Sequence, residues 1–127
     1  MPSSVHYESH DQYFAAQPHA VQLILHMIQR EVEARLPEAV RCIGYNVPAF
    51  RLGKVFPYFA AFKKHIGIYP PLTADQSLIE SLAQFRGPKG NLSFPLDKPL
   101  PYRLIGDVAE ALAAQYRKVG SSRQAAG

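Results

Sequence analysis

YNVPAFRLGKVFPYFAAFKKHIGIYP, residues 45–70, is rich in aromatic and apolar residues and is divided by short turn signals. Aromatic and β-branched residues favour strands. Gly53-Lys54 and Lys63-Lys64 are candidate turns, and Pro48 separates two extended pieces at the start. The expected extended segments are Cys42 to Val47, Ala49 to Leu52, Val55 to Phe62 and His65 to Tyr69. Because the connections are short, we expect an antiparallel meander.

The aromatic residues of the third segment fall on both faces of the expected strand. By strict alternation, one face carries Phe56, Tyr58, Ala60 and Phe62, and the other carries Phe59 and Ala61. Two apolar faces indicate burial on both sides or a lined pocket. Neighbouring Arg51 and Lys54 would allow base stacking, but aromatic residues on strands are more often core, which we favour. Pro57 cannot donate to a ladder and predicts an edge, a bulge or a strand start.

Helices are predicted upstream of this stretch. A long helix from Pro18 to Leu36 is indicated by apolar residues at helical spacing, namely Val21, Ile24, Leu25, Ile28, Val32 and Leu36. Pro18 suits its first turn, where a missing N–H is no loss. A short helix from Asp11 to Ala16 is expected before it, with Ser9 or Asp11 as its cap.

Downstream, Pro70-Pro71 ends the meander and a helix, a strand and a last helix follow. Thr73 or Asp75 is expected to cap the first helix, which Gly87 and Gly90 end. Asn91 to Phe94 predicts a strand, and the proline-rich segment 95–101 predicts a rigid connector. The apolar residues of the two helices are Leu78, Ile79, Leu82 and Phe85, then Leu104, Ile105, Val108, Leu112 and Tyr116.

The fold class that follows is α+β. We expect an antiparallel sheet of about four to five strands with helices packed on one face, in the order α-β-β-β-α-β-α. The 127 residues fit one domain. We place that domain at residues 11–119, with flexible termini at 1–10 and 120–127.

The composition limits which cellular compartment and which kinds of binding partner we expect. The single cysteine, Cys42, excludes an intramolecular disulfide and a multi-thiolate zinc site. No signal peptide and no membrane-length apolar run is recognisable, so we expect a soluble, cytoplasmic protein without a membrane partner. The net charge of +4 permits an anionic partner without requiring one. We expect a small anionic ligand or a protein partner, and not a nucleic acid; the sequence leaves the oligomeric state open.

Two basic segments are candidate ligand sites. Lys63, Lys64 and His65 could hold a phosphate or a carboxylate, with Tyr58 on the neighbouring strand, although short basic turns are commonly only solvated. In RGPKGN, Arg86, Lys89 and Asn91 lie between glycines that allow backbone N–H groups to converge on an anion. A plain connector explains the same residues, and the spacing is not that of a phosphate-binding P-loop.

Other chemistry has weaker support. The five histidines form no pair at tight ligand spacing on the long helix. Cys42 lies among apolar residues, which favours an inert thiol over a nucleophile. We therefore assign no catalytic residue, expect no cofactor and leave the metal question open.

Three segments resemble the YdhG-like family of small bacterial domains of unknown function. They are residues 45–70, the helix end LPEAVRCIGYNVP, and FRGPKGNLSFPLDKPLP from Phe85 to Pro101. The resemblance implies an α+β fold and no settled reaction. One branch of the family is described as a frataxin-like intracellular iron chaperone, which implies iron as a possible ligand. Clustered carboxylates would be expected for that role, whereas the acidic residues here are scattered in the sequence.

The sequence therefore predicts a binding or chaperone-like domain and not an enzyme. The expected binding surface lies between the KKH turn, residues 63–65, and the RGPKGN loop, residues 86–91. Two alternatives remain: an iron-delivery protein, and an enzyme that acts on a small acidic metabolite with His65 as acid or base.

Overall fold

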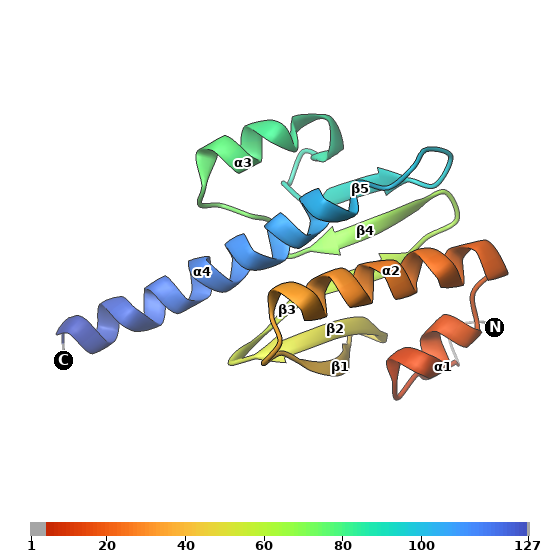
Figure 1. The fold of residues 1–127 in the computed structure, drawn as a ribbon, viewed down its shortest axis with the longest axis horizontal. Coiled ribbons are helices and arrows are strands. Elements are labelled where there is room, and N and C mark those ends of the chain that lie inside the picture. Colours follow the sequence, from red (N-terminus) through yellow and green to blue (C-terminus); the bar gives the residue numbers. More distant parts are fainter. Residues whose placement is uncertain (1–4, 127) are drawn as a thin grey trace.

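The computed structural model describes residues 5–126, with side chains to Tyr116. Its centre is one antiparallel sheet of five strands in the spatial order β1-β2-β3-β4-β5. The strands are β1 (Val40–Gly44), β2 (Val47–Leu52), β3 (Lys54–Ala61), β4 (His65–Tyr69) and β5 (Leu92–Pro95). Strands β1 to β4 form the expected meander, and β5 returns to pair with β4 after a helical excursion (Figure 1).

Four α-helices accompany the sheet: α1 (His10–Ala15), α2 (His19–Arg35), α3 (Gln76–Ser81) and α4 (Tyr102–Ala126), with a short 3-10 helix η2 (Ala83–Phe85) after α3. Helices α2 and α4 cover the same face of the sheet and pack against each other, whereas α3 lies beyond the β5 edge (Figure 1). The predicted α+β class with helices on one face is confirmed. Within residues 5–126, no helix has both the length and the apolar character needed to cross a membrane.

Several predicted boundaries are confirmed. Pro18 lies one residue before the first turn of α2, as its N-cap, and Ser9 caps α1 by accepting a hydrogen bond from Gln12 N at 3.1 Å. Asp75 caps α3 by accepting from Leu78 N at 3.2 Å. Ser9 and Asp75 each satisfy a backbone N–H that has no partner inside its helix, whereas Pro18 makes no side-chain cap.

The first hairpin differs from the prediction. The chain turns at Tyr45-Asn46 and not at Pro48, which lies within β2 opposite Ile43. Tyr45 and Asn46 have φ values of 53° and 64°, as a two-residue type I′ turn requires. Asn46 tolerates this left-handed conformation, and its side chain also accepts a hydrogen bond from Tyr7 N at 2.8 Å.

Pro57 marks a bulge, one of the three outcomes that the sequence predicted. The register changes between Ala49↔Tyr58 and Arg51↔Val55, so β3 uses one residue more than β2. The extra residue reverses the alternation. Phe56 therefore points into the core and does not share a face with Tyr58, which corrects the predicted face assignment.

The core lies between the sheet and helices α2 and α4. Its largest fully buried side chains are Phe14, Phe50, Phe56, Phe59, Phe94, Leu25, Ile28, Ile66, Ile68, Leu82, Ile105 and Leu112. The helix face predicted from spacing supplies Leu25, Ile28 and Val32, all without exposed surface. Arg35 links the two helices by ion pairs to Asp107 and Glu110 of α4.

The N-terminal segment packs closer to the domain than the predicted boundary at residue 11 implied. His10 is buried, with Nε2 2.8 Å from Ala49 O and 3.1 Å from Cys42 O. Its Nδ1 is 2.9 Å from Nε2 of the buried Gln29. An Nε2-H imidazole satisfies all these partners, since the carbonyls accept and the amide donates. At the other end, the backbone of α4 continues through residues 120–126, and Gly127 lies outside the described residues.

Replacing Ile28 with Ala should lower the free energy of unfolding by about 2–5 kcal/mol, because the side chain is fully buried and its removal leaves a cavity. The matched control is Leu23→Ala on the same helix, where the side chain is 59% exposed and little change is expected. Urea denaturation followed by circular dichroism measures both. Equal midpoints for Ile28→Ala and the parent would contradict the packing described.

Stability should also depend on pH through His10. Burial lowers the pKa of His10 below its ordinary value of 6.5, against the opposing effect of the two carbonyl contacts. Because the unfolded chain then takes up the proton first, the free energy of unfolding should fall as pH drops below about 6.5. Between pH 7 and 5, His10→Gln should show a smaller slope than the parent, with the exposed His19→Gln as control. Identical slopes for His10→Gln and the parent would rule out this role.

Candidate functional site

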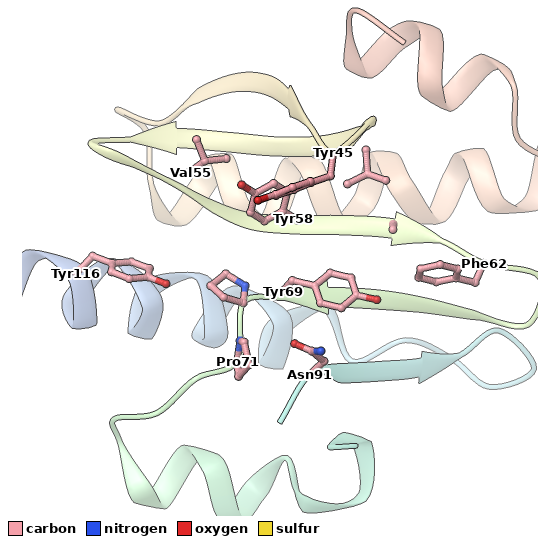
Figure 2. A pocket seen from close by; sticks show the side chains of 11 residues that line it. Tyr45, Val55, Tyr58, Phe62, Tyr69, Pro71, Asn91 and Tyr116 are labelled. Atoms are coloured by element: carbon pink, nitrogen blue, oxygen red, sulfur yellow. The ribbon is translucent and has the colours of Figure 1, made fainter. Parts of the chain in front are cut away.

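The face of the sheet opposite α2 and α4 is covered by the protein's own aromatic side chains. A groove of about 590 Å³ runs across it; we call it the tyrosine groove. It is lined by Tyr45, Val47, Val55, Tyr58, Ala60, Phe62, Tyr69, Pro70, Pro71, Asn91 and Tyr116. Figure 2 shows these side chains over strands β3 and β4, with Tyr116 reaching the groove from α4. The lining contains four phenol hydroxyls, one amide and no charged side chain.

Two glycines make room for the aromatic rings. A Cβ on Gly44 would lie 2.6 Å from Cε2 of Tyr58, which belongs to a strand two positions away in the sheet. A Cβ on Gly67 would lie 2.8 Å from the Tyr69 hydroxyl and 2.9 Å from Cε2 of Phe62. The rings therefore lie over backbone that carries no side chain. This packing keeps the groove shallow and its floor aromatic.

The groove exposes apolar surface that a core would bury. The Tyr45 side chain is 89% exposed and that of Phe62 is 44% exposed, whereas Tyr58 and Tyr69 are partly covered. The Tyr45 and Tyr58 rings are 5.6 Å apart. Burial, and then the neighbouring Tyr45, raise the pKa of Tyr58, so its hydroxyl stays protonated and can donate a hydrogen bond at neutral pH.

A second hollow of about 460 Å³, here the basic hollow, lies at the end of β4 and β5. Its lining is Lys64, His65, Gln84, Phe85, Arg86, Gly87, Ser93, Phe94, Pro95, Lys98, Pro99 and Pro101. Three cationic side chains and an imidazole line it, and no carboxylate does. The two hollows meet where the ring of Phe62, in the groove, stacks on that of His65, in the hollow, at 4.8 Å and 21°.

The residues predicted from sequence are divided between these two places. Lys64, His65 and Arg86 line the basic hollow, so the KKH turn and the start of the RGPKGN loop do converge. The other four candidates lie elsewhere: Tyr58 and Asn91 line the tyrosine groove, and Lys63 and Lys89 line neither. Lys63 and Lys89 are exposed.

Sequence reasoning left Tyr116 and Lys98 out of the candidate sites and misplaced Tyr45. Tyr45 was expected inside a strand, and its place at a turn follows only once Asn46 is recognised as a left-handed residue. Tyr116 was assigned to the core face of the last helix, and it also reaches the groove. Lys98 was treated only as part of the proline-rich connector, and nothing in its local sequence indicates that it lines the basic hollow.

The described residues offer little support for a metal site or a reactive thiol. Among the described residues, no three His, Cys, Asp or Glu side chains are grouped so as to hold a metal ion. Cys42 is half-buried on β1, and burial raises the pKa of its thiol. The thiol is therefore protonated at neutral pH and is a poor nucleophile.

The fold matches that of a known protein. A crystallised DUF1801-family protein from Bacillus subtilis, YdhG, superposes with a TM-score of 0.69 and 17% sequence identity. The match covers 79% of this chain and 84% of that one. No protein-family model and no curated protein matches the chain. The predicted resemblance is thus confirmed at the level of the fold, and DUF1801 denotes a domain of unknown function.

The close packing of the aromatic rings on Gly44 and Gly67 can be tested by adding one methyl group. Gly44→Ala should displace the Tyr58 ring and lower the free energy of unfolding by about 1–3 kcal/mol, because the new Cβ overlaps Cε2. The chain has no tryptophan, so its near-ultraviolet circular dichroism reports tyrosine and phenylalanine packing and should change. Gly87→Ala is the matched control, since its Cβ would meet nothing closer than 3.7 Å. An unaltered spectrum and an unaltered unfolding midpoint for Gly44→Ala would contradict the packing of Tyr58 on Gly44.

Proposed function

We propose that this domain is a binding protein for a small organic ligand with a planar ring, which stacks in the tyrosine groove. The observation that carries the proposal is the open, helix-free sheet face, on which aromatic rings line a hollow of about 590 Å³. That volume is within the range of small-ligand sites. Aromatic rings offer flat apolar surfaces on which a planar ring can stack, and their hydroxyls can orient it.

The exposure of these rings supports a ligand over a purely structural role. Tyr45 and Phe62 keep much of their apolar surface in water, and the intervening Tyr58 and Tyr69 make the exposed surface continuous. A contiguous exposed apolar patch on a small domain usually marks a binding surface. A planar guest would remove this surface from water at about 25 cal/mol per Å².

The composition of the lining favours binding over catalysis. The groove contains phenols, an amide and apolar side chains, but no histidine, carboxylate or lysine that could move a proton at neutral pH. The phenol of Tyr58, whose pKa is raised by burial, is a hydrogen-bond donor and not a base. The enzyme alternative would have to use His65, which lines the other hollow.

A neutral probe tests the groove alone. We expect 1-naphthol to shift backbone NMR signals of β3, β4 and residues 45–47, and Tyr58→Ala to weaken its binding about five- to tenfold through the lost ring contact. Leu23→Ala, exposed on the opposite side of the molecule, is the control and should bind as the parent does. Shifts spread over the whole surface, or equal affinities for Tyr58→Ala and the parent, would defeat the proposal.

A further inference from the structure

The basic hollow brings together cations that have no carboxylate in its lining. Arg35 is paired with Glu31, Asp107 and Glu110, and Arg41 with Glu33. Lys64, Arg86 and Lys98 form no ion pair with any residue that the structure describes. Converging cations that lack a protein partner create a positive potential in the hollow, and this potential attracts an anion.

Backbone hydrogen bonds hold the walls of the hollow in place. Leu96 N donates to Lys64 O at 2.9 Å, which ties the KKH turn to the segment that follows β5. On the other side, Gly87 N donates to Asn91 O at 2.9 Å and closes the RGPKGN loop. The backbone on both sides of β5 is thus fixed, and a ligand has to order only the side chains that it contacts.

Position 90 of the RGPKGN loop requires glycine for two reasons. Its φ of +89° is in the left-handed region that L side chains rarely adopt. A Cβ on it would lie 2.8 Å from Nη2 of Arg86 and 3.0 Å from Pro71. The Nη2 atom of Arg86 therefore lies beside the buried backbone of Gly90, close to Pro71 of the tyrosine groove, although Arg86 itself lines the basic hollow.

The hollow and the groove are adjacent parts of one surface. Along β4, Tyr69 lines the groove and His65, on the same face four residues earlier, lines the hollow. That separation is about 13 Å. The Phe62–His65 stack is the wall that both share. A small molecule that lies across this stack would contact both.

We propose that the ligand is a planar-ring anion, whose ring stacks in the tyrosine groove and whose phosphate or carboxylate binds Lys64, Arg86 and Lys98 in the basic hollow. This inference rests on the proposed function and adds the charge of the ligand to it. A guanidinium beside ammonium groups suits both acids, since charge-assisted hydrogen bonds to phosphate and to carboxylate are similarly strong. His65, with its ring stacked on Phe62, lies at the junction of the two parts.

Probes that share a ring and differ in charge test the inference. We would titrate the protein with 1-naphthol, 1-naphthyl phosphate, 1-naphthoate and inorganic phosphate at about pH 7.5, where a phosphate monoester carries nearly two negative charges. Naphthyl phosphate should bind roughly tenfold or more tightly than naphthol and shift signals in both hollows. Inorganic phosphate alone should shift residues 64–65 and 86–87 only. The naphthoate arm shows whether the site takes carboxylates as well as phosphates.

Arg86→Gln and Lys64→Gln should each remove most of the gain from the anionic group and leave naphthol binding unchanged. Arg30→Gln removes the same charge from the exposed side of α2 and should leave the gain intact. Equal affinities for naphthol and both anionic probes would overturn the inference while the proposed function stands. So would a gain that Arg30→Gln reduces as much as Arg86→Gln, which would reflect net charge alone. Failure of naphthol to bind would overturn the proposed function and this inference together.

Discussion

Strand β3 carries one residue more than β2 opposite Phe50, and both faces of the sheet depend on that insertion. Successive residues of a strand point to opposite faces, so an extra residue reverses the assignment on one side of it. Here the reversal lets Phe56 and Phe59 both enter the core. It also lets Val55 and Tyr58 both line the groove. With uninterrupted alternation, a core phenylalanine would have to lie among the groove residues, at the cost of its contacts with the helices.

The groove also requires glycine at two strand positions where a larger side chain would normally be found. Gly44 and Gly67 weaken their strands, since glycine has the largest conformational entropy to lose and no side chain to pack. In return, Tyr58, Tyr69 and Phe62 lie over the bare backbone. The rings shield backbone that no helix covers and still present their outer faces to solvent. A sheet stabilised only by packing would gain more from valine or isoleucine at the two glycine positions.

Local signals predicted the elements well, and the faces poorly. Pro18 and Asp75 mark helix starts that can be predicted, because the effect of each on the backbone is confined to a few neighbouring residues. The turn at Asn46 was missed because a nearby proline offered a stronger-looking break, although Asn tolerates the left-handed conformation. Phe56 was placed on the wrong face because the number of residues in a bulge is set by the partner strand. Tyr116 joins the groove from a helix far along the chain, which no local pattern records.

The distribution of charge explains why composition alone could not locate a site. The chain carries ten acidic residues, and four of them, all on α2 and α4, neutralise two arginines on the helical side of the sheet. Lys64, Arg86 and Lys98 form no such ion pair with a described residue, and all three line the hollow at the end of β4 and β5. A ligand that approaches the open face meets neutral rings and then positive charge. The carboxylates of α2 and α4 are on the opposite side of the sheet, where they are engaged with Arg35 and Arg41.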